Sequence, residues 1–521
     1  MPDGSSHKPE TPKYVLWETH NKIHPKSVNG RYRSVKTWLL YALLGFFMIL
    51  PWIRWDRGPD APNQAVLLDM SQGRFFIFGL EIWPQEIYYL TGLLVIAAIG
   101  LFMATALAGR VWCGFTCPQT VWTDLFVWAE RLAEGDRAER IRNDKGPFTT
   151  RKLMRKSAKH AIWLAISIVS AFGFCAYFTD APTLLHDLVT FDAGATTWSF
   201  FALFGIGTYG MAGWTREQMC MYMCPWPRIQ SAMLDEHSLV VTYDALRGDS
   251  RGPRRKSESW DERTARGLGD CIDCNQCVQV CPMGIDVRTG DQSDCINCGL
   301  CVDACDGIMD SIGRPRGLIA FESLARQAAA AADPAATAPV PAAPSHAATK
   351  TTGCGGGGCA SGGCGTAAKP KTPIARARII IYLVLMTVIG SAMTVALTQR
   401  SAFTLAVQRD RAPLYITLSN GAIRNAYTVK IANKTRDERH YVLTAAGVPG
   451  LTLSTAGSED AHGDRLTLTA AGDSVGTFRV YVTAPAGTKL DASTPLSIVS
   501  ATEDGRKERN SYSTVFMAPA Q

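Results

Sequence analysis

The 521-residue sequence has no basic stretch with interleaved aromatic side chains, and its net charge of +7 is modest and dispersed. Nucleic-acid binding requires a concentrated basic surface, so these absences argue against DNA or RNA as a partner. The N-terminus also lacks the charged start, short apolar run and small-residue cleavage site of a signal peptide. The first apolar run begins only near residue 37, and we expect it to stay in the chain as a membrane anchor.

Charge is absent from five apolar segments of about 17–23 residues. Each is long enough to cross a hydrocarbon core of about 30 Å as a helix. A single run of this kind can be a buried core helix, but five in one chain favour membrane spans. The predicted five-helix transmembrane region comprises Thr37–Ile53, Ile87–Gly109, Ala161–Thr179, Thr196–Trp214 and Ile379–Thr398.

Lysine and arginine are absent from Asp180–Ala195, which carries three aspartates. By contrast, residues 1–36 hold seven Lys or Arg against three acids, and the segment Arg110–His160 is also rich in basic residues. Basic loops remain in the cytoplasm. We therefore predict a multi-pass protein of the bacterial inner membrane, with a cytoplasmic N-terminus and a periplasmic C-terminal domain.

Cysteine is absent from the C-terminal region after residue 400, so no disulfide can form within it. Short alternating runs separated by Asn-Gly, Gly and Pro turns predict a β-sandwich there. These runs are Leu414–Leu418, Tyr427–Ile431, Arg465–Thr469 and Phe478–Val482.

Sixteen cysteines in a mostly cytoplasm-facing chain indicate metal or redox chemistry rather than a disulfide framework. Eight of them form two tandem units with the spacing Cys-x-x-Cys-x-x-Cys-x-x-x-Cys. Such a loop wraps three thiolates around a cubane cluster, and the fourth ligand comes from the other unit, as in two-cluster ferredoxins. One predicted [4Fe–4S] ligand set is Cys271, Cys274, Cys277 and Cys305. The other is Cys295, Cys298, Cys301 and Cys281.

Zinc is the alternative metal for paired Cys-x-x-Cys motifs. Two complete four-cysteine runs in tandem, with Pro282 after the first, favour iron–sulfur clusters instead. The second run has Asp306 where the first has proline, but its cysteine spacing is intact.

Two further cysteine pairs follow the second and fourth predicted spans, each in the pattern Cys-x-x-x-Cys-Pro. The pairs are Cys113 with Cys117 and Cys220 with Cys224. Soft thiolates suit Cu(I), and a dithiol can also relay electrons. Buried small residues at a helix end are the alternative, but the repetition at equivalent places favours a copper-handling or electron-relay site.

A low-complexity stretch, residues 325–373, separates the cysteine-rich region from the last span. Its glycine-rich part contains Cys354, Cys359 and Cys364, which could bind a soft metal, although a flexible linker is the simpler interpretation. The predicted domains are a tail (1–36), four spans (37–214), a cytoplasmic ferredoxin domain (215–322), a linker (323–378), a fifth span (379–398) and an outer domain (400–521).

These motifs together resemble the FixG/CcoG-type cytochrome c oxidase accessory proteins, also called RdxA-like. The ferredoxin motifs are widespread, but their combination with two Cys-x-x-x-Cys-Pro pairs is much narrower. The resemblance is carried by His24–Arg33, Cys113–Asp124, Cys220–Gln230, Cys281–Arg288, Asp303–Asp306 and Gly313–Ile319. The chain departs from the family pattern in its 325–373 insertion.

The resemblance implies an immunoglobulin-like C-terminal domain and a role in building a cbb3-type oxidase, through reduction of Cu(II) to Cu(I). The implied partners are oxidase assembly factors and copper chaperones or transporters, with an electron donor that the sequence does not identify. Two other functions stay open: a membrane electron-transfer subunit that feeds a periplasmic reductase or quinone, and an assembly scaffold with structural clusters.

Overall fold

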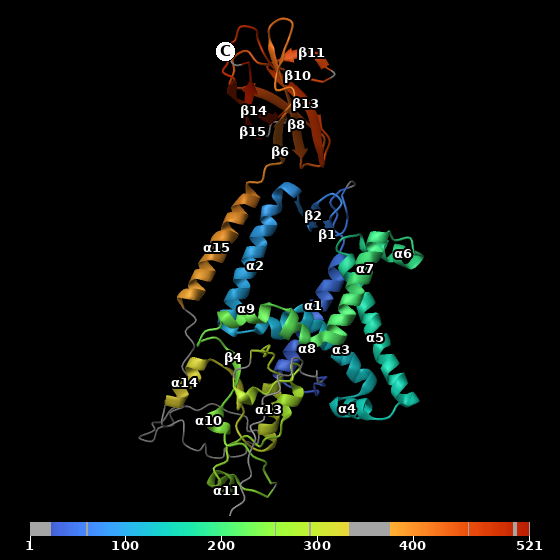
Figure 1. The fold of residues 1–521 in the computed structure, drawn as a ribbon, viewed down its shortest axis with the longest axis vertical. Coiled ribbons are helices and arrows are strands. Elements are labelled where there is room, and N and C mark those ends of the chain that lie inside the picture. The colour runs from blue at the N-terminus through green and yellow to red at the C-terminus, as the bar shows by residue number, and fades with distance from the viewer. Residues whose placement is uncertain are drawn as a thin grey trace, which may run out of the picture. The chain divides into compact units, whose positions relative to one another are not determined.

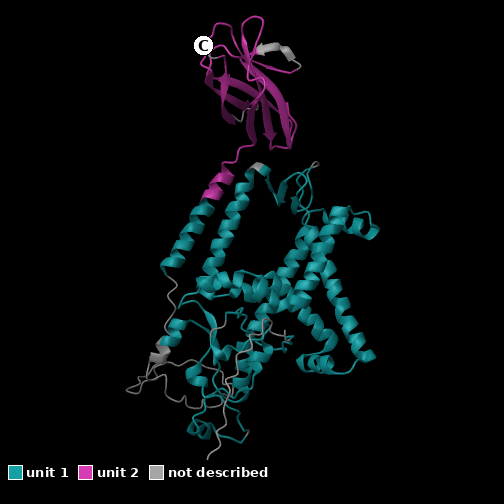
Figure 2. Cartoon of the chain, in the orientation of Figure 1, with its two compact units in different colours: residues 1–391 teal, residues 392–521 magenta. Residues whose placement is uncertain are grey.

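The computed structural model describes residues 22–58, 61–255, 257–290, 293–332, 376–456, 458–503 and 508–519. The chain forms two compact units, residues 1–391 and 392–521, which are coloured separately in Figure 2. The division falls inside helix α15 (Ala377–Thr398). This helix is labelled in Figure 1, and the two colours of Figure 2 meet within it. Cys354, Cys359 and Cys364 lie outside the described residues.

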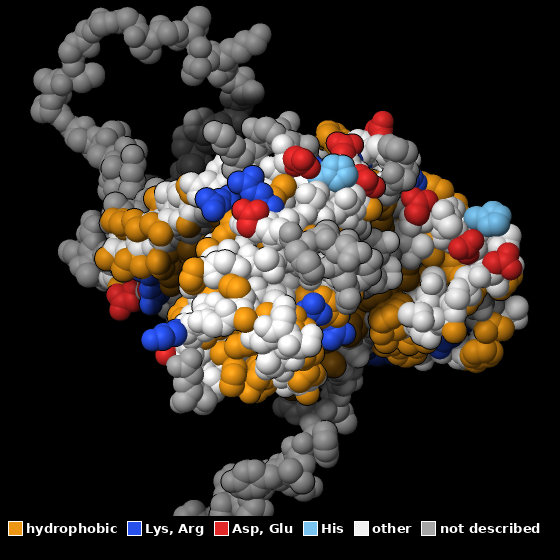
Figure 3. All heavy atoms as spheres, turned by 90° about the horizontal axis from the view of Figure 1, so that it is seen from above, with side chains coloured by type: hydrophobic (Ala, Val, Ile, Leu, Met, Phe, Trp, Pro, Cys, Tyr) orange, Lys and Arg blue, Asp and Glu red, His pale blue; other side chains and the backbone are white. Residues whose placement is uncertain are grey.

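Four helices in the described ranges are long and apolar enough to cross a membrane. They are Arg31–Trp52 (α1, Arg31–Ile49, with a 3-10 turn), α2 (Ile87–Ala108), α5 (Thr150–Cys175) and α15. Many of their large apolar side chains are exposed, and Figure 3 shows hydrophobic side chains gathered in patches at the surface. Water-soluble monomers rarely expose so much apolar surface, so these helices indicate a membrane protein.

The predicted span Thr196–Trp214 is divided in the structure. Helix α7 (Ala195–Thr208) continues into the π-helical segment η4 (Tyr209–Thr215) without leaving the right-handed helical region at Tyr209. Gly205, Gly207, Gly210 and Gly213 weaken regular α-helix here, because glycine loses more backbone entropy than other residues. The prediction that five helices span the membrane therefore stays a prediction.

Helices α3 (Pro118–Glu134), α4 (Arg137–Lys145) and α5 are joined by buried ion pairs. Glu130 of α3 accepts hydrogen bonds from Arg140 of α4 and from Arg216 of the short helix α8 (Arg216–Gln218). Burial favours the protonated acid, but Arg216 and Arg140 hold the pKa of Glu130 below its usual value. The pairs tie the chain just before Cys220 to the helix that follows Cys117.

A three-stranded antiparallel sheet and a short helix lie in the loops between the spanning helices. The sheet is β1 (Val66–Asp69), β2 (Arg74–Ile77) and β3 (Leu80–Ile82), and the helix is α6 (Ala181–Thr190). Buried Arg57 donates to the backbone carbonyls of Phe78, Gln64 and Ala65, which fixes the loop that leads into the sheet.

The cysteine-rich domain is closed by strand β4 (Val240–Tyr243), which pairs antiparallel with β5 (Ile319–Glu322). Between them lie α10 (Ala245–Gly248), α11 (Trp260–Ala265), α12 (Gln276–Val280) and α13 (Leu300–Ser311). Helix α14 (Leu324–Ala332) follows β5, at the point where the sequence predicted the linker to begin. Its alanine-rich sequence has high helix propensity, and Ala325 N–H donates to Glu236 O, so this part is ordered.

The C-terminal unit is an immunoglobulin-like β-sandwich. One sheet has the order β11-β10-β13-β8-β6, with β7 beside β8, and the other has the order β12-β9-β14-β15. The strands are β6 (Phe403–Arg409), β7 (Ile416–Thr417), β8 (Ile423–Asn433), β9 (Arg439–Ala446), β10 (Thr452–Thr455), β11 (Ser458–Gly463), β12 (Arg465–Ala470), β13 (Ser474–Ala484), β14 (Ser493–Thr502) and β15 (Arg509–Met517). All four predicted alternating runs contain strand residues, and a core that includes Tyr427, Tyr441 and Phe516 fills the space between the sheets.

Candidate redox metal centres

The two four-cysteine units fold in the same way, as a loop that leads into a helix. Residues between the cysteines adopt the left-handed conformation: Asp273 and Asn275 before α12, and Asn297 and Gly299 before α13. Asp, Asn and Gly tolerate this conformation better than other residues do. The repeated left-handed turns coil each loop tightly, so that its cysteines face a common interior.

Each unit's fourth cysteine lies with the other unit's first three. Burial and the neighbouring Cys298 and Cys295 raise the pKa of Cys281 to about 12. Burial and three neighbours raise the pKa of Cys305 to about 12 as well, the neighbours being Cys277, Cys271 and Cys274. We call Cys281, Cys295, Cys298 and Cys301 the inner cluster site. We call Cys271, Cys274, Cys277 and Cys305 the outer cluster site.

The residues present fit [4Fe–4S] clusters. A cavity is lined by Cys277 and by all four cysteines of the inner cluster site, together with apolar side chains such as Val287 and Ile296. All the described cysteines are free thiols. Within the described ranges, no group of three or more donors is spaced for a single metal ion. A cubane places its thiolates on four separate irons, which requires this wider spacing, and bound iron ionises the thiols.

The two cluster sites differ in their surroundings. Cys274 of the outer cluster site is exposed, whereas Cys298 of the inner cluster site is buried. Cys298 belongs to an apolar cluster that also contains Cys113, with Cys220 packed against it. The outer site therefore reaches solvent through Cys274, although its Cys271 and Cys277 are buried. The inner site lies against the helix-end cysteines.

The two Cys-x-x-x-Cys-Pro segments have matching conformations. Cys113 lies in the π-helical turn η3 (Trp112–Thr116), and Cys220 lies in the π-helical turn η5 (Met219–Met223). Cys117 and Cys224 are extended, and proline then starts a helix, α3 in the first segment and α9 (Trp226–Met233) in the second. Each cysteine pair therefore spans a π-helical turn and the start of the helix that follows it.

The four cysteines of these segments converge, and we call Cys113, Cys117, Cys220 and Cys224 the four-thiol site. Burial, followed by Cys117 and Cys220, raises the pKa of Cys113 to about 12. Burial, followed by Cys117 and Cys224, raises the pKa of Cys220 to about 11. Cys113 and Cys220 are therefore protonated at neutral pH, and a metal ion must displace their protons to bind them.

Polar groups orient individual thiols of the four-thiol site. Cys113 Sγ donates to Gln230 Oε1 at 2.9 Å, and Gln230 Nε2 donates to Thr105 Oγ1 at 3.1 Å. The amides of Gln119 and Thr120, at the start of α3, face Cys117 and favour its thiolate, although burial raises its pKa overall. The fully buried Gln230 had no signal in the sequence beyond its place in the second segment.

The four-thiol site is in direct contact with the inner cluster site. A Cβ atom on Gly114 would lie 2.6 Å from Ile296 O, so only glycine allows this approach. Met221 packs in the same apolar cluster, whereas Met223 is 62% exposed. Of these two methionines of η5, Met221 therefore lies near the thiols and Met223 does not.

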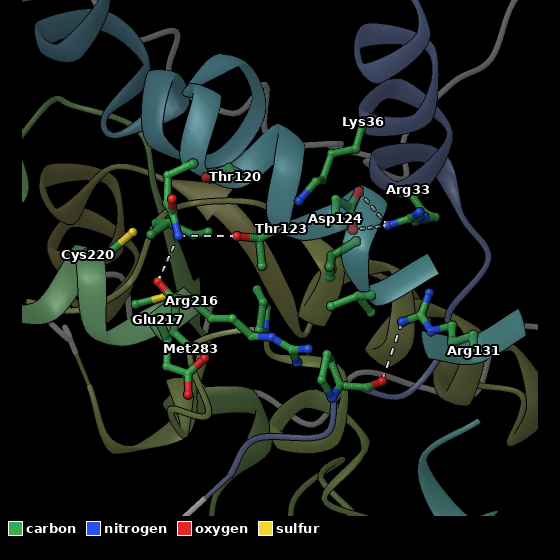
Figure 4. Close-up of a pocket in the computed structure, with 16 residues that line it drawn as sticks. Arg33, Lys36, Thr120, Thr123, Asp124, Arg131, Arg216, Glu217, Cys220 and Met283 are labelled. Atoms are coloured by element: carbon green, nitrogen blue, oxygen red, sulfur yellow. Dashed lines mark hydrogen bonds and ion pairs between the residues drawn. The ribbon is translucent and has the colours of Figure 1, made fainter. Parts of the chain in front are cut away.

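A polar pocket adjoins Cys220 (Figure 4). Cys220, Glu217 and Met283 all line it, and Arg33 pairs with Asp124 at 2.8 Å on its other side. Lys36 and Arg33 hold the pKa of Asp124 below its usual value, against the effect of burial. The pocket places Glu217 and Met283 beside Cys220, but its lining also carries the cations Arg33, Lys36, Arg131 and Arg216.

The start of the first spanning helix, α1, is hydrogen-bonded to α13, the helix that carries Cys301 of the inner cluster site. Helix α1 has no cap of its own, but the Asp303 carboxylate accepts hydrogen bonds from Tyr32 N at 3.1 Å and Arg33 N at 2.7 Å. A Cβ atom on Gly30 would lie 2.3 Å from Asp303 Cγ, so glycine is required at this position. Asp303 sits between the cluster-site cysteines Cys301 and Cys305. The sequence motifs around Gly30 and Asp303 give no sign of this contact.

Replacement of Asp303 by alanine is expected to lower the free energy of unfolding by about 1–2 kcal/mol, because α1 loses its N-terminal cap. Tryptic cleavage at Lys26 should accelerate at the same time, since the segment is released. Asp310→Ala is the matched control, because Asp310 lies on the same helix but pairs only with exposed Arg316. Equal cleavage rates in the two variants would contradict the capping role.

Three family models match the chain. A 4Fe–4S dicluster domain matches residues 215–324, and a 4Fe–4S binding domain matches residues 90–133, which include Cys113 and Cys117. An Ig-like fold found at the C-terminus of FixG matches residues 393–519. The cysteine-rich domain is therefore of the iron–sulfur ferredoxin type.

Two relatives match nearly the whole length. The chain is 41% identical over 514 residues to the nitrogen fixation protein FixG of Rhizobium meliloti, which covers 97% of this chain and 94% of that protein. It is 42% identical over 473 residues to protein RdxA of Cereibacter sphaeroides, with 91% of each covered. A crystal structure of a FixG-related protein from Vibrio parahaemolyticus covers 23% of this chain and 99% of that one, at 18% identity and a TM-score of 0.20.

Proposed function

The chain belongs to the FixG/RdxA-like family, and from this premise we propose that it reduces Cu(II) to Cu(I) for the copper site of a cbb3-type oxidase. The coarser description, an iron–sulfur electron-transfer protein, rests on the family-model matches. The observation that carries the copper proposal is the convergence of the four-thiol site against the inner cluster site.

The arrangement supports a route for single electrons. A [4Fe–4S] cluster at each cluster site would supply one-electron redox chemistry, which matches the one electron that Cu(II) accepts. Exposed Cys274 marks the entry side, and buried Cys298 lies on the side of the four-thiol site. No three donors among the described residues are close enough for one ion, so copper would be held by a pair of these thiols at a time. Soft thiolates prefer Cu(I) to Cu(II), so copper held by such a pair is easier to reduce.

Each residue of the four-thiol site has a distinct part in this proposal. Cys113 is held in position by Gln230, and Cys117 lies at the amide end of α3, where a thiolate is most favoured. Copper, as substrate, would reach Cys220 through the polar pocket lined by Glu217 and Met283. Cu(I) would then leave for a copper chaperone or transporter that serves oxidase assembly.

A copper assay separates this function from its alternatives. Anaerobic protein reduced with dithionite and desalted should convert Cu(II) to Cu(I), trapped by a chromogenic Cu(I) chelator, in proportion to the electrons stored. A subunit that feeds a periplasmic reductase or quinone would pass its electrons to those acceptors and leave Cu(II) untouched. A scaffold with structural clusters would reduce neither. Free copper can also meet a reduced cluster directly, so the assay is decisive only with the variants discussed below.

A second candidate for the four-thiol site is an iron–sulfur relay. The 4Fe–4S binding model that matches residues 90–133 includes Cys113 and Cys117, and the second segment supplies two further thiols. Iron analysis of the same variants distinguishes iron at this site from copper.

We place the four-thiol site and both cluster sites in the cytoplasm, with the C-terminal domain in the periplasm of a bacterial inner membrane. In this topology α7 and η4 together form the fourth of five crossings. Reporter tags after Gly248 should therefore signal cytoplasm, and tags after Gln521 should signal periplasm. A cytoplasmic signal from the C-terminal tag would mean that one crossing is missing.

A further inference from the structure

A third cavity, of about 500 Å³, adjoins the inner cluster site at Cys295. Its wall includes Cys295, a cysteine of that site, and it shares no lining residue with the polar pocket beside Cys220. Sites of this size commonly accept small organic molecules. A molecule bound here would lie against an inner-site thiolate without touching the four-thiol site.

The lining combines apolar contact with hydrogen-bond donors. Leu234, Val240 and Leu324 supply the apolar part, and Ser231 and Asn297 are among the polar groups. This mixture suits a flat ring with carbonyl or hydroxyl oxygens.

Arg110 is the strongest polar feature of the cavity. Its side chain is buried, and it donates to Ser293 O, to Ser231 Oγ and, at 3.1 Å, to Cys295 O. Its Nε is enclosed by protein atoms and has no hydrogen-bond partner among the described residues. Arg110 therefore contributes its positive charge to the cavity wall rather than a free donor.

The cavity lies where the spanning helices meet the cysteine-rich domain. Arg376, immediately before α15, pairs with Asp235 of the cavity wall at 2.7 Å and donates to Ala106 O, near the end of α2, at 3.0 Å. Ser238 also donates to Ala106 O. A ligand dissolved in the membrane therefore meets this cavity at the boundary of the hydrocarbon core.

We propose that this cavity binds a quinol and passes its electrons to the inner cluster site. Each quinol becomes a quinone by releasing two electrons, one at a time, and two protons. A cluster held by Cys281, Cys295, Cys298 and Cys301 would accept the two electrons one after the other, passing on the first before it takes the second. The protons go to water by way of the exposed Glu236 carboxylate at the cavity wall.

The inference rests on the proposed electron-transfer function but not on copper. Quinone binding is measured first, by titration calorimetry of the full-length protein in detergent with decylubiquinone and with menadione. Leu324→Trp and Leu234→Trp fill the cavity without altering a cysteine, and each should weaken binding at least about 10-fold. Leu246→Trp, on exposed α10 outside the cavity, is the control and should bind as the wild type does.

Cluster reduction provides the second readout. Decylubiquinol or menadiol should reduce the inner cluster in the wild type, as followed by electron paramagnetic resonance, and at least about 10-fold more slowly in the two filled variants. Dithionite should reduce all proteins equally. The proposal is overturned if neither quinone binds the wild type, or if the filled variants bind and are reduced normally. Loss of copper reduction alone changes none of these readouts, so the two proposals fail independently.

Discussion

The double variant Cys113→Ser, Cys220→Ser is expected to lose at least about 100-fold in the rate of Cu(II) reduction. Even the partners that orient a metal's ligands are worth 10–100-fold in affinity or activity, and this variant removes two of four soft ligands outright. Serine is close in size to cysteine but is a hard oxygen donor, so the fold is retained while the preference for Cu(I) is lost.

Three measurements make the result decisive. The rate is read with the chromogenic Cu(I) chelator after dithionite reduction, and the cluster spectra and iron content are recorded on the same sample. Cys175→Ser is the matched control, because Cys175 is buried among Ala176, Ala181 and Leu184, away from every cysteine site. The double variant is expected to keep both cluster signals and its full iron content. A normal rate would make the pairs structural, and a loss of iron would identify the four-thiol site as an iron–sulfur relay.

The variant Cys281→Ala is expected to lose the inner cluster and keep the outer one. In sequence, Cys281 belongs to the unit that supplies Cys271, Cys274 and Cys277, but in space it lies with Cys295 and Cys298. Iron content should fall by about half, since each of two cubanes holds four irons.

Reference variants identify which signal is lost. Cys298→Ala marks the inner cluster and Cys274→Ala the outer one, so the spectrum of Cys281→Ala should match that of Cys298→Ala. Cys305→Ala is the reciprocal test and should match Cys274→Ala. If Cys281→Ala instead removed only the outer signal, each unit would supply all four ligands of its own cluster.

The apolar runs and cysteine spacings were sufficient to predict the main parts of the fold, because both depend on local sequence. The helix boundaries predicted from these apolar runs were less accurate. Helix α1 begins at Arg31 rather than Thr37, and α5 begins at Thr150 rather than Ala161. These first turns are charged, so hydropathy misses them. Tertiary partners stabilise the extra turn of α1, as in the pairing of Arg33 with Asp124.

The candidate sites were predictable only in part, for the same reason. Spacing identified the cysteine pairs, but their convergence depends on the packing of α3 against Arg216, a contact far apart in sequence. The cap that Asp303 provides to α1 also joins residues far apart in sequence, and no sequence motif predicts it. The cavity beside Cys295 combines residues from α9, β4, α14 and three loops, so no single stretch of sequence carries it.

The cap on α1 also sets an order of biosynthesis. Tyr32 N–H is satisfied by a residue 271 positions later in the chain, so the ribosome delivers the first membrane helix long before its cap exists. The first membrane helix therefore leaves the ribosome without this cap and acquires it only after α13, which carries Asp303, has been made.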